Sequence, residues 1–251
     1  MSESNKATRE VCDVDIRVLS TKAPFLWFDT ANTTTTNIKG DSTYATKKGA
    51  KSIAFQNPLE GTMTIEAQVL PFKMYAMLSD GTMHADGVKS VKTTITAAVA
   101  GTLTITPGTN EAVQTGTVFV YTEGDFGDET KAIEGTFATN TFTATTPADI
   151  VLGDKYDVGY LVAKSAGVNR VSISTSKIPP DYYITMNTYE KGEDAIITPF
   201  VITAYKASIQ RNLDMSFASS GDPTSVTLTF DLLEDKDGNM IDILEDTDEA
   251  E

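Results

Sequence analysis

Strict alternation of apolar and polar residues is the feature of this chain that most constrains its fold. The segment 225–232, SVTLTFDL, alternates almost without interruption, and segments 62–69 and 202–217 follow the same period of two. Successive side chains of a β-strand point to opposite faces of its sheet, so this period predicts strands with one buried and one polar face. Adjacent strands of this kind make a sheet with one wet side, a geometry also found in barrels with a polar interior.

The composition extends this prediction to the whole chain. Threonine, a β-branched residue that favours strands, occurs 38 times among the 251 residues, and glycine, asparagine and proline separate the threonine-rich segments. One segment, PFKMYAMLSDG at 71–81, has helical spacing, with Pro71 suited to a first turn and Gly81 suited to a stop. We therefore expect an all-β fold, a β-sandwich or partial barrel with one short helix.

Three regions separate along the chain. Residues 1–87 and 166–244 carry the longer strands and predict one discontinuous β domain. Residues 88–165 contain short strands at the spacing of a small β-sandwich and predict an independent module between the two halves. Residues 245–251 are acidic at five of seven positions and predict a flexible tail.

The acidic segment DKDGN at 235–239 raises the question of a calcium loop. An EF-hand loop needs oxygen ligands at positions 1, 3 and 5, glycine at 6 and glutamate at 12. Counting from Asp235 places Met240 at position 6, and counting from Leu233 loses the first ligand. Alternating residues flank the segment on both sides, so we predict a hairpin turn joining two strands, and no metal site.

The charge of the chain limits its partners. The net charge is -15 and the isoelectric point is near 4.4, which argues against a basic patch that binds nucleic acid. Two explanations stay open: solubility, or a surface that avoids adhering to a polyanion. A single cysteine, Cys12, fits a reducing compartment, and neither a membrane span nor a secretion signal is expected.

Residues for catalysis are scarce. The chain has one histidine, His84, and one cysteine, and it contains no phosphate-binding or dinucleotide-binding motif. Acidic residues are plentiful, so a carboxylate pair is available by residue type alone. No nucleophile, base and orienting group can be assembled from the sequence, so we expect a protein that is not an enzyme and has no cofactor.

Two long segments carry a family resemblance. Residues 40–81, GDSTYATKKGAKSIAFQNPLEGTMTIEAQVLPFKMYAMLSDG, and residues 207–244, ASIQRNLDMSFASSGDPTSVTLTFDLLEDKDGNMIDIL, resemble the tail tube (major tail) proteins of long-tailed bacteriophages of Gram-positive bacteria. The middle region, 88–165, resembles the immunoglobulin-like insertion that such proteins often carry on their outer surface.

The resemblance implies a structural virion protein, made in the host cytoplasm, that forms hexameric rings. Each subunit would contribute sheet to a continuous β-barrel, and stacked rings would form a tube through which DNA passes during ejection without specific binding. The partners would be further copies of the chain and other tail proteins: the terminator, the tape measure and, in a contractile tail, the sheath. No membrane is involved.

The resemblance also assigns residues to the two surfaces of such a tube. The polar positions of the alternating strands would face an acidic lumen: Glu66, Gln68, Asp214, Thr227, Thr229 and Asp231. The loop around residues 40–52 would contact the next ring through Gly40, Asp41, Lys47, Lys48 and Lys51. The alternative for this loop is a solvated segment without a partner.

Other classes of function remain alternatives. A virion decoration or receptor-binding protein would use the middle region to bind glycan and would form a discrete oligomer rather than a polymer. A cell-surface adhesive module and a carboxylate-dependent enzyme are further alternatives. The sequence does not distinguish a contractile from a non-contractile tail.

Overall fold

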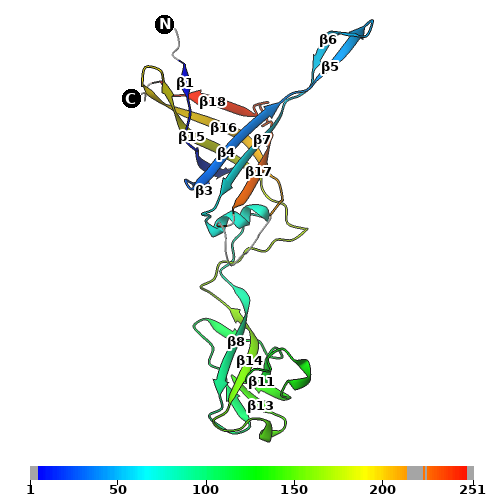
Figure 1. Cartoon of the computed structure of the whole chain (residues 1–251), viewed down its shortest axis with the longest axis vertical. Coiled ribbons are helices and arrows are strands. Elements are labelled where there is room, and N and C mark those ends of the chain that lie inside the picture. The colour runs from blue at the N-terminus through cyan, green and yellow to red at the C-terminus, as the bar shows by residue number, and fades with distance from the viewer. Residues whose placement is uncertain (1–4, 214–222, 224, 248–251) are drawn as a thin grey trace. The chain divides into compact units, whose positions relative to one another are not determined.

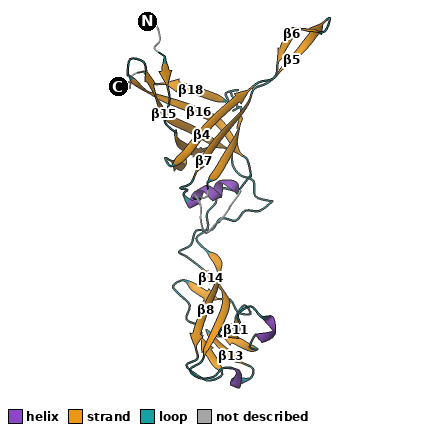
Figure 2. Cartoon of the chain, in the orientation of Figure 1, coloured by secondary structure: helices purple, strands orange, loops and turns teal. Residues whose placement is uncertain are grey.

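The computed structural model describes residues 5–213, 223 and 225–247 and confirms an all-β chain (Figures 1 and 2). The chain divides into two compact units. Unit 1 comprises Met1–Thr82 and Ser172–Glu251, and unit 2 is the intervening segment Met83–Val171. The sequence placed the inserted module at 88–165, within unit 2.

Unit 1 is built around a nine-stranded antiparallel sheet with the strand order β3-β2-β15-β16-β17-β7-β4. Two short strands extend it: β1 pairs with β15, and β18 pairs with β16. The strands of the sheet are β1 (Lys6–Ala7), β2 (Asp13–Val18), β3 (Pro24–Phe28), β4 (Ala31–Lys39), β7 (Glu60–Ala67), β15 (Tyr182–Gly192), β16 (Ile197–Ile209), β17 (Val226–Leu233) and β18 (Ile241–Glu245).

Alternation in the sequence becomes alternation of burial in this sheet. In β17, Val226, Leu228 and Phe230 are buried, whereas the residues between them are exposed or half-buried. The same holds in β7 for Met63 and Ile65. The buried face packs against residues of β2, β3, β15 and β16 in one hydrophobic core. The opposite face of β7 and β17 is therefore left polar.

The predicted helix forms as a 3-10 helix, η1 (Phe72–Leu78), preceded by Pro71. Its residues Met74, Met77 and Leu78 are buried in the core of unit 1. Just after the helix, Asp80 forms an ion pair with Lys177 at 2.8 Å. The helix therefore covers the apolar face of the sheet and does not form a separate site.

The predicted hairpin at DKDGN is wrong. Leu233, the last residue of β17, faces Lys206, and Ile241, the first residue of β18, faces Ala204. Both strands thus run along one side of β16 in the same direction. The segment between them loops out through a tight turn, in which the backbone N–H of Asp235 donates to the carbonyl of Asn239 at 2.9 Å, but the turn does not pair β17 with β18. Leu232 is buried in the core, and Met240 and Ile241 pack against it, so the chain rejoins β16 after the loop, whereas Ile243 and Leu244 of β18 stay exposed.

Asp235 explains the shape of this loop. Its Oδ1 accepts the backbone N–H of Asn239 at 2.8 Å and of Asp237 at 2.9 Å. These hydrogen bonds favour the charged carboxylate and hold the pKa of Asp235 below its usual range, the bond from Asn239 having the largest effect. Gly238 adopts φ +84°, which glycine tolerates without strain.

Strands β5 (Ser42–Lys47) and β6 (Ala50–Gln56) form a separate two-stranded sheet, hereafter the finger (Figure 1). The finger continues from β4 and returns to β7. Apart from the half-buried Ser42, every residue of both strands is exposed. Asn57 closes its base by donating its backbone N–H to the carbonyl of Asp41 at 2.9 Å.

Unit 2 contains a four-stranded sheet, with β14 between β8 on one side and β10 and β11 on the other, and a three-stranded sheet, β12-β13-β9. A separate core, which includes Leu103, Phe142 and Val158, holds the two sheets together. Its elements are β8 (Gly87–Thr96), β9 (Thr102–Thr104), β10 (Glu111–Val113), β11 (Phe119–Thr122), η2 (Glu129–Lys131), β12 (Gly135–Ala138), β13 (Thr141–Ala144), η3 (Pro147–Asp149) and β14 (Lys155–Lys164).

The C-terminal strand β18 extends through Glu245, the first residue of the expected acidic tail. Glu245 faces Phe200 in the sheet and forms an ion pair with Lys6 of β1. Residues 248–251 lie outside the described residues.

Candidate functional site

The polar face of strands β4, β7 and β17 is the first candidate surface. Register places Glu66 of β7 opposite Thr227 of β17 and Thr33 of β4. Paired residues of an antiparallel sheet point to the same side, so these three side chains share one face. The pairing continues through Thr64 and Thr229, and the face therefore crosses three adjacent strands.

Four of the six residues predicted to face a lumen lie together on this face: Glu66, Thr227, Thr229 and Asp231. Gln68 is exposed in the bend after β7, beyond the last paired residue, Ala67. Asp214 lies outside the described residues. The four residues share a face because the pairing of β7 with β17 places polar residues opposite polar residues.

Sequence reasoning missed the contribution of β4. Thr33, Thr35 and Asn37 pair with Glu66, Thr64 and Thr62, and they extend the polar face to one end of the sheet's strand order. Threonine fills both sides of this strand, so no alternation marks it in the sequence. The core-side Thr34 instead accepts the backbone N–H of Cys12 at 3.3 Å.

The charge on this face is acidic and sparse. Glu66 and Asp231 supply carboxylates among threonine hydroxyls, and the side-chain amide of Gln210 donates to Asp231 at 2.7 Å. At the far end of β4 and β7, Lys39 and Glu60 form an exposed ion pair at 3.2 Å. Hydroxyls and carboxylates accept hydrogen bonds from water, so this face is suited to staying hydrated.

The finger is the second candidate surface, and the segment expected as a loop around residues 40–52 is this β-hairpin with its base. Three of the five residues predicted for ring contact lie in the finger, and the other two lie beside it. Gly40 and Asp41 lie at its base, Lys47 ends β5, and Lys51 lies in β6. Lys48 adopts φ +49° in the turn between the strands. The strands and turn of the finger contain three lysines and no acidic residue, although the chain as a whole is strongly acidic.

The two faces of the finger differ in character. Phe55 faces Thr43 and Ile53 faces Ala45, and both apolar side chains are 57% exposed. Alternation along β5 places Lys47 on the same face as Ala45. The other face carries Tyr44, over whose ring the Lys51 ammonium lies at 3.9 Å. The finger thus presents an uncovered apolar strip that ends in a lysine.

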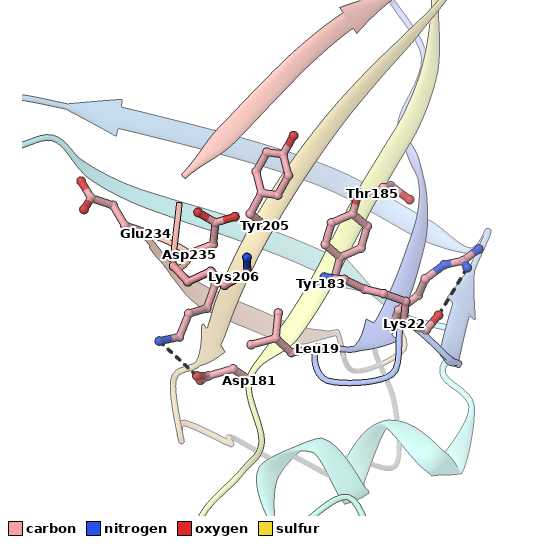
Figure 3. A pocket seen from close by; sticks show the side chains of 11 residues that line it. Leu19, Lys22, Asp181, Tyr183, Thr185, Tyr205, Lys206, Glu234 and Asp235 are labelled. Carbon is pink, nitrogen blue, oxygen red and sulfur yellow. Dashed lines mark hydrogen bonds and ion pairs between the residues drawn. The ribbon is translucent and has the colours of Figure 1, made fainter. Parts of the chain in front are cut away.

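A groove on unit 1 is the third candidate surface (Figure 3). It has a volume of about 1130 Å³ and lies over β2, β15 and β16 beside the loop that follows β17. Tyr183 and Tyr205 form its aromatic floor, with ring centroids 6.1 Å apart in an edge-to-face arrangement. Leu19 adds an apolar side chain, and Glu234 and Asp235 line the side formed by the loop.

Four cations line the groove, and each has a partner: Lys236 pairs with Asp237 at 3.1 Å at the exposed end of the loop. Arg17 pairs with Asp15 at 2.6 Å, and Lys206 pairs with Asp181 at 3.6 Å. The Lys22 ammonium lies 3.8 Å from the ring centroid of Tyr183. Burial lowers the pKa of Lys22, and the charge of Asp235 partly opposes that effect.

The tyrosine floor is fixed in place by β18. The Tyr205 hydroxyl donates to the carboxylate of Asp242, and this hydrogen bond, with a smaller effect of burial, raises the pKa of Tyr205 to about 12. Tyr205 therefore stays protonated at neutral pH and keeps its ring oriented toward Tyr183. Among the described residues, Glu234 forms no ion pair, so the groove retains an available carboxylate.

Acidic clusters and apolar helices are the remaining features that could form a metal site or a membrane span. Within residues 5–213, 223 and 225–247, no group of three or more His, Cys, Asp or Glu side chains is placed to hold a metal ion. Asp125 and Asp128, two acidic residues of a turn in unit 2, instead contact Lys131 and Thr130. No helix in the described part of the chain is long and apolar enough to span a membrane.

Comparison with known proteins places the chain in a family. No curated protein matches the sequence. The sequence model described as the YomU/Tube protein family matches residues 7–243, which include the polar face, the finger, the groove and all of unit 2. Because this match covers nearly the whole chain, the protein belongs to the YomU/Tube protein family.

Proposed function

We propose that this protein polymerises as stacked hexameric rings into the tail tube of a long-tailed bacteriophage of a Gram-positive host. The observation that carries the proposal is the polar, uncovered face of β4, β7 and β17, which lies opposite the hydrophobic core of unit 1. In the tube this face lines the lumen. The family match supports a structural rather than a catalytic role.

Ring closure gives the ends of the sheet a partner. Strand β4 stands at one end of the strand order of unit 1 and contains neither proline nor a lysine before Lys39, the features that usually protect an edge. Six copies arranged head to tail about a rotation axis join such ends into one closed barrel. Closure therefore removes an edge that would otherwise promote uncontrolled aggregation.

The chemistry of the lumen face suits passage of DNA without binding. Tight binding of DNA relies on lysine and arginine that displace counterions from phosphates. The face instead presents Glu66, Asp231 and threonine hydroxyls, which repeat around the ring. Like charges keep the phosphate backbone hydrated and away from the wall, so DNA slides during ejection.

Ring stacking uses the finger. Its exposed strands gain nothing from the core of their own chain, and an isolated two-stranded hairpin has marginal stability in water. Contact with the next ring covers its apolar strip. The terminator and the tape measure, and the sheath if the tail contracts, would meet the finished tube.

Electron microscopy of the purified full-length protein after prolonged incubation at high concentration tests this function. We expect hollow tubes with a regular axial repeat and sixfold rings in end views. A protein that stays monomeric at every concentration, also when mixed with a preformed tail-tip complex, would contradict the proposal.

A second candidate, glycan binding through unit 2, is favoured by one observation. Phe119 is 55% exposed on β11, and the ring of Phe126 lies over Gly159, the residue that pairs with Phe119, with the Lys92 ammonium 4.4 Å from the Phe126 centroid. Exposed aromatic rings beside polar groups can stack against sugars. Binding of cell-wall polysaccharide that is lost in Phe119→Ala would support this role, and absence of binding to any host polysaccharide would exclude it.

A further inference from the structure

We propose that the groove of Tyr183 and Tyr205 is the receptor for the finger of a second copy of this chain in the adjacent ring. This inference rests on the proposed tube function and identifies where the finger binds. The occupant is the face of the finger that carries Phe55, Ile53 and Lys47.

The two surfaces match in their apolar parts. Phe55 and Ile53 leave 57% of their surface exposed, and the groove offers two tyrosine rings and Leu19 at half-buried positions. Burying apolar surface stabilises a contact by about 25 cal/mol per Å² before the costs of ordering. An apolar strip on a finger and an apolar floor in a groove of about 1130 Å³ each lack a cover in the single chain.

The two surfaces also match in charge. The strands and turn of the finger carry only positive charge, from Lys47, Lys48 and Lys51. In the groove, the cations are paired or stacked, whereas the carboxylate of Glu234 forms no ion pair among the described residues. Lys47 follows the apolar strip of the finger, and Glu234 lies at the side of the apolar floor (Figure 3). Docking the strip on the floor brings these opposite charges together.

One tyrosine of the groove already binds a lysine of the same chain. The Lys22 ammonium lies over the Tyr183 ring, a cation–π contact, and Lys51 makes the same contact with Tyr44 in the finger. The ring of Tyr205 remains available to a further cation or apolar side chain at the floor. The finger of a second copy carries a cation and apolar side chains on one short hairpin.

Figure 1 explains why the occupant comes from another copy. The finger leaves the sheet of unit 1 beyond the end of β4, whereas the groove lies over β2, β15 and β16. A contact between two different patches is heterologous and propagates from copy to copy. Such a contact builds a stack of rings and not a closed dimer.

Charge reversal tests this pairing. Lys47→Glu and Glu234→Lys are each expected to leave single rings intact and to raise the protein concentration needed for tubes at least tenfold. The double variant Lys47→Glu/Glu234→Lys restores the opposite charges and should bring that concentration back to within about threefold of the wild type. A tenfold step corresponds to about 1.4 kcal/mol per ring added to the stack, shared among the contacts that the ring makes.

Matched controls carry the same charge changes on unit 2. Lys155→Glu and Glu129→Lys alter exposed residues there and should assemble as the wild type does. Tubes formed normally by both single variants, or a double variant no better than the single ones, would overturn the assignment of the groove and leave the tube function standing. Loss of rings as well as stacks would overturn it too, whereas a wild type that never polymerises would refute the tube function itself.

Discussion

Strands β4 and β7 and strands β5 and β6 belong to one continuous excursion of the chain, yet only the first pair has a core beneath it. Glu60–Ala67 alternates between buried and polar residues, whereas Ala50–Gln56 is exposed throughout. Both pairs use the same β-favouring residues and the same antiparallel pairing. β-favouring residues are therefore enough to make a strand, and the surface that covers its apolar side decides whether the strand serves folding or assembly.

The largest difference in stability should appear when a phenylalanine is truncated to alanine in the core of unit 1 and, separately, in the finger. Phe230 is 0% exposed in the core of unit 1, so Phe230→Ala should lower the unfolding free energy of unit 1 by about 3–5 kcal/mol. Phe55→Ala in the finger should change it by less than about 0.5 kcal/mol, as surface substitutions do. Urea unfolding followed by the single tryptophan, Trp27 of unit 1, measures both changes.

Equal destabilisation by the two truncations would contradict the comparison, because it would mean that the finger is part of the folded core. Phe142→Ala in unit 2 is the control. It should leave the Trp27 transition in place, since Phe142 belongs to the other core.

Tube formation, unlike stability, should be more sensitive to a substitution in the finger. Phe55→Asp places a charge in the apolar strip of the finger, and we expect tubes to disappear at concentrations at which the wild type assembles fully. The urea midpoint of unit 1 should stay unchanged. Sedimentation of tubes and of single rings at several concentrations measures this effect, and Thr46→Asp on the other face of the finger is the control.

Normal tube formation by Phe55→Asp would show that the finger remains solvated in the tube. The exposure of Phe55 and Ile53 would then need another explanation.

Reversing the lumen charges should affect DNA more than structure. Glu66→Lys/Asp231→Lys changes two half-buried residues of the polar face, and we expect the tube to form but to bind double-stranded DNA about tenfold more tightly at low salt, with an affinity that falls as salt rises. A filter-binding titration at two salt concentrations measures it. The pair Glu129→Lys/Asp149→Lys on unit 2 provides the same change in net charge.

Equal DNA binding by the lumen pair and the unit 2 pair would mean that net charge, and not the polar face, governs contact with DNA. That result would remove Glu66 and Asp231 from the lumen.

The smallest effect is the pH dependence of the turn after η1, where Asp80 forms an ion pair with Lys177. The finger contains no carboxylate and should contribute no such dependence. The hydrogen bond from Lys177, the largest of several causes, lowers the pKa of Asp80 to about 2. The unfolded chain binds this proton first, so the contribution of Asp80 is complete above about pH 4 and is lost as the pH falls toward 2. Asp80→Asn should therefore make unit 1 less dependent on pH between 4 and 2.

Urea midpoints of the wild type and Asp80→Asn at pH 5, 4, 3 and 2.5 measure this difference. Parallel curves for the two proteins would show that the ion pair with Lys177 does not form in solution.

The comparison between strands also explains which parts of the fold could be predicted. The strand at 226–233 was expected at 225–232, and η1 was expected within 71–81, because each is amphipathic against the same core. Strand β4 and the path after Leu233 were not foreseen. Threonine fills both faces of β4, and the acidic turn residues after Leu233 resemble those of a hairpin although the chain continues along β16.

For the candidate surfaces, the sequence located four polar residues that share a face but could not show that β4 extends it. It located the lysines of the finger but gave no sign of the groove, whose residues come from β2, β15, β16 and the loop after β17. Residues that are distant in the chain meet only when strands pair, and pairing partners are set by long-range contacts.

Local period and composition alone predict the strand-rich class, the middle module at 88–165 and the polar character of one face of the alternating strands. Strand order, the route of the chain along β16 and the apolar floor of Tyr183 and Tyr205 depend instead on how distant strands pair. Alternation sets which side of a strand is apolar, whereas burial of that side against a common core selects the neighbours of the strand.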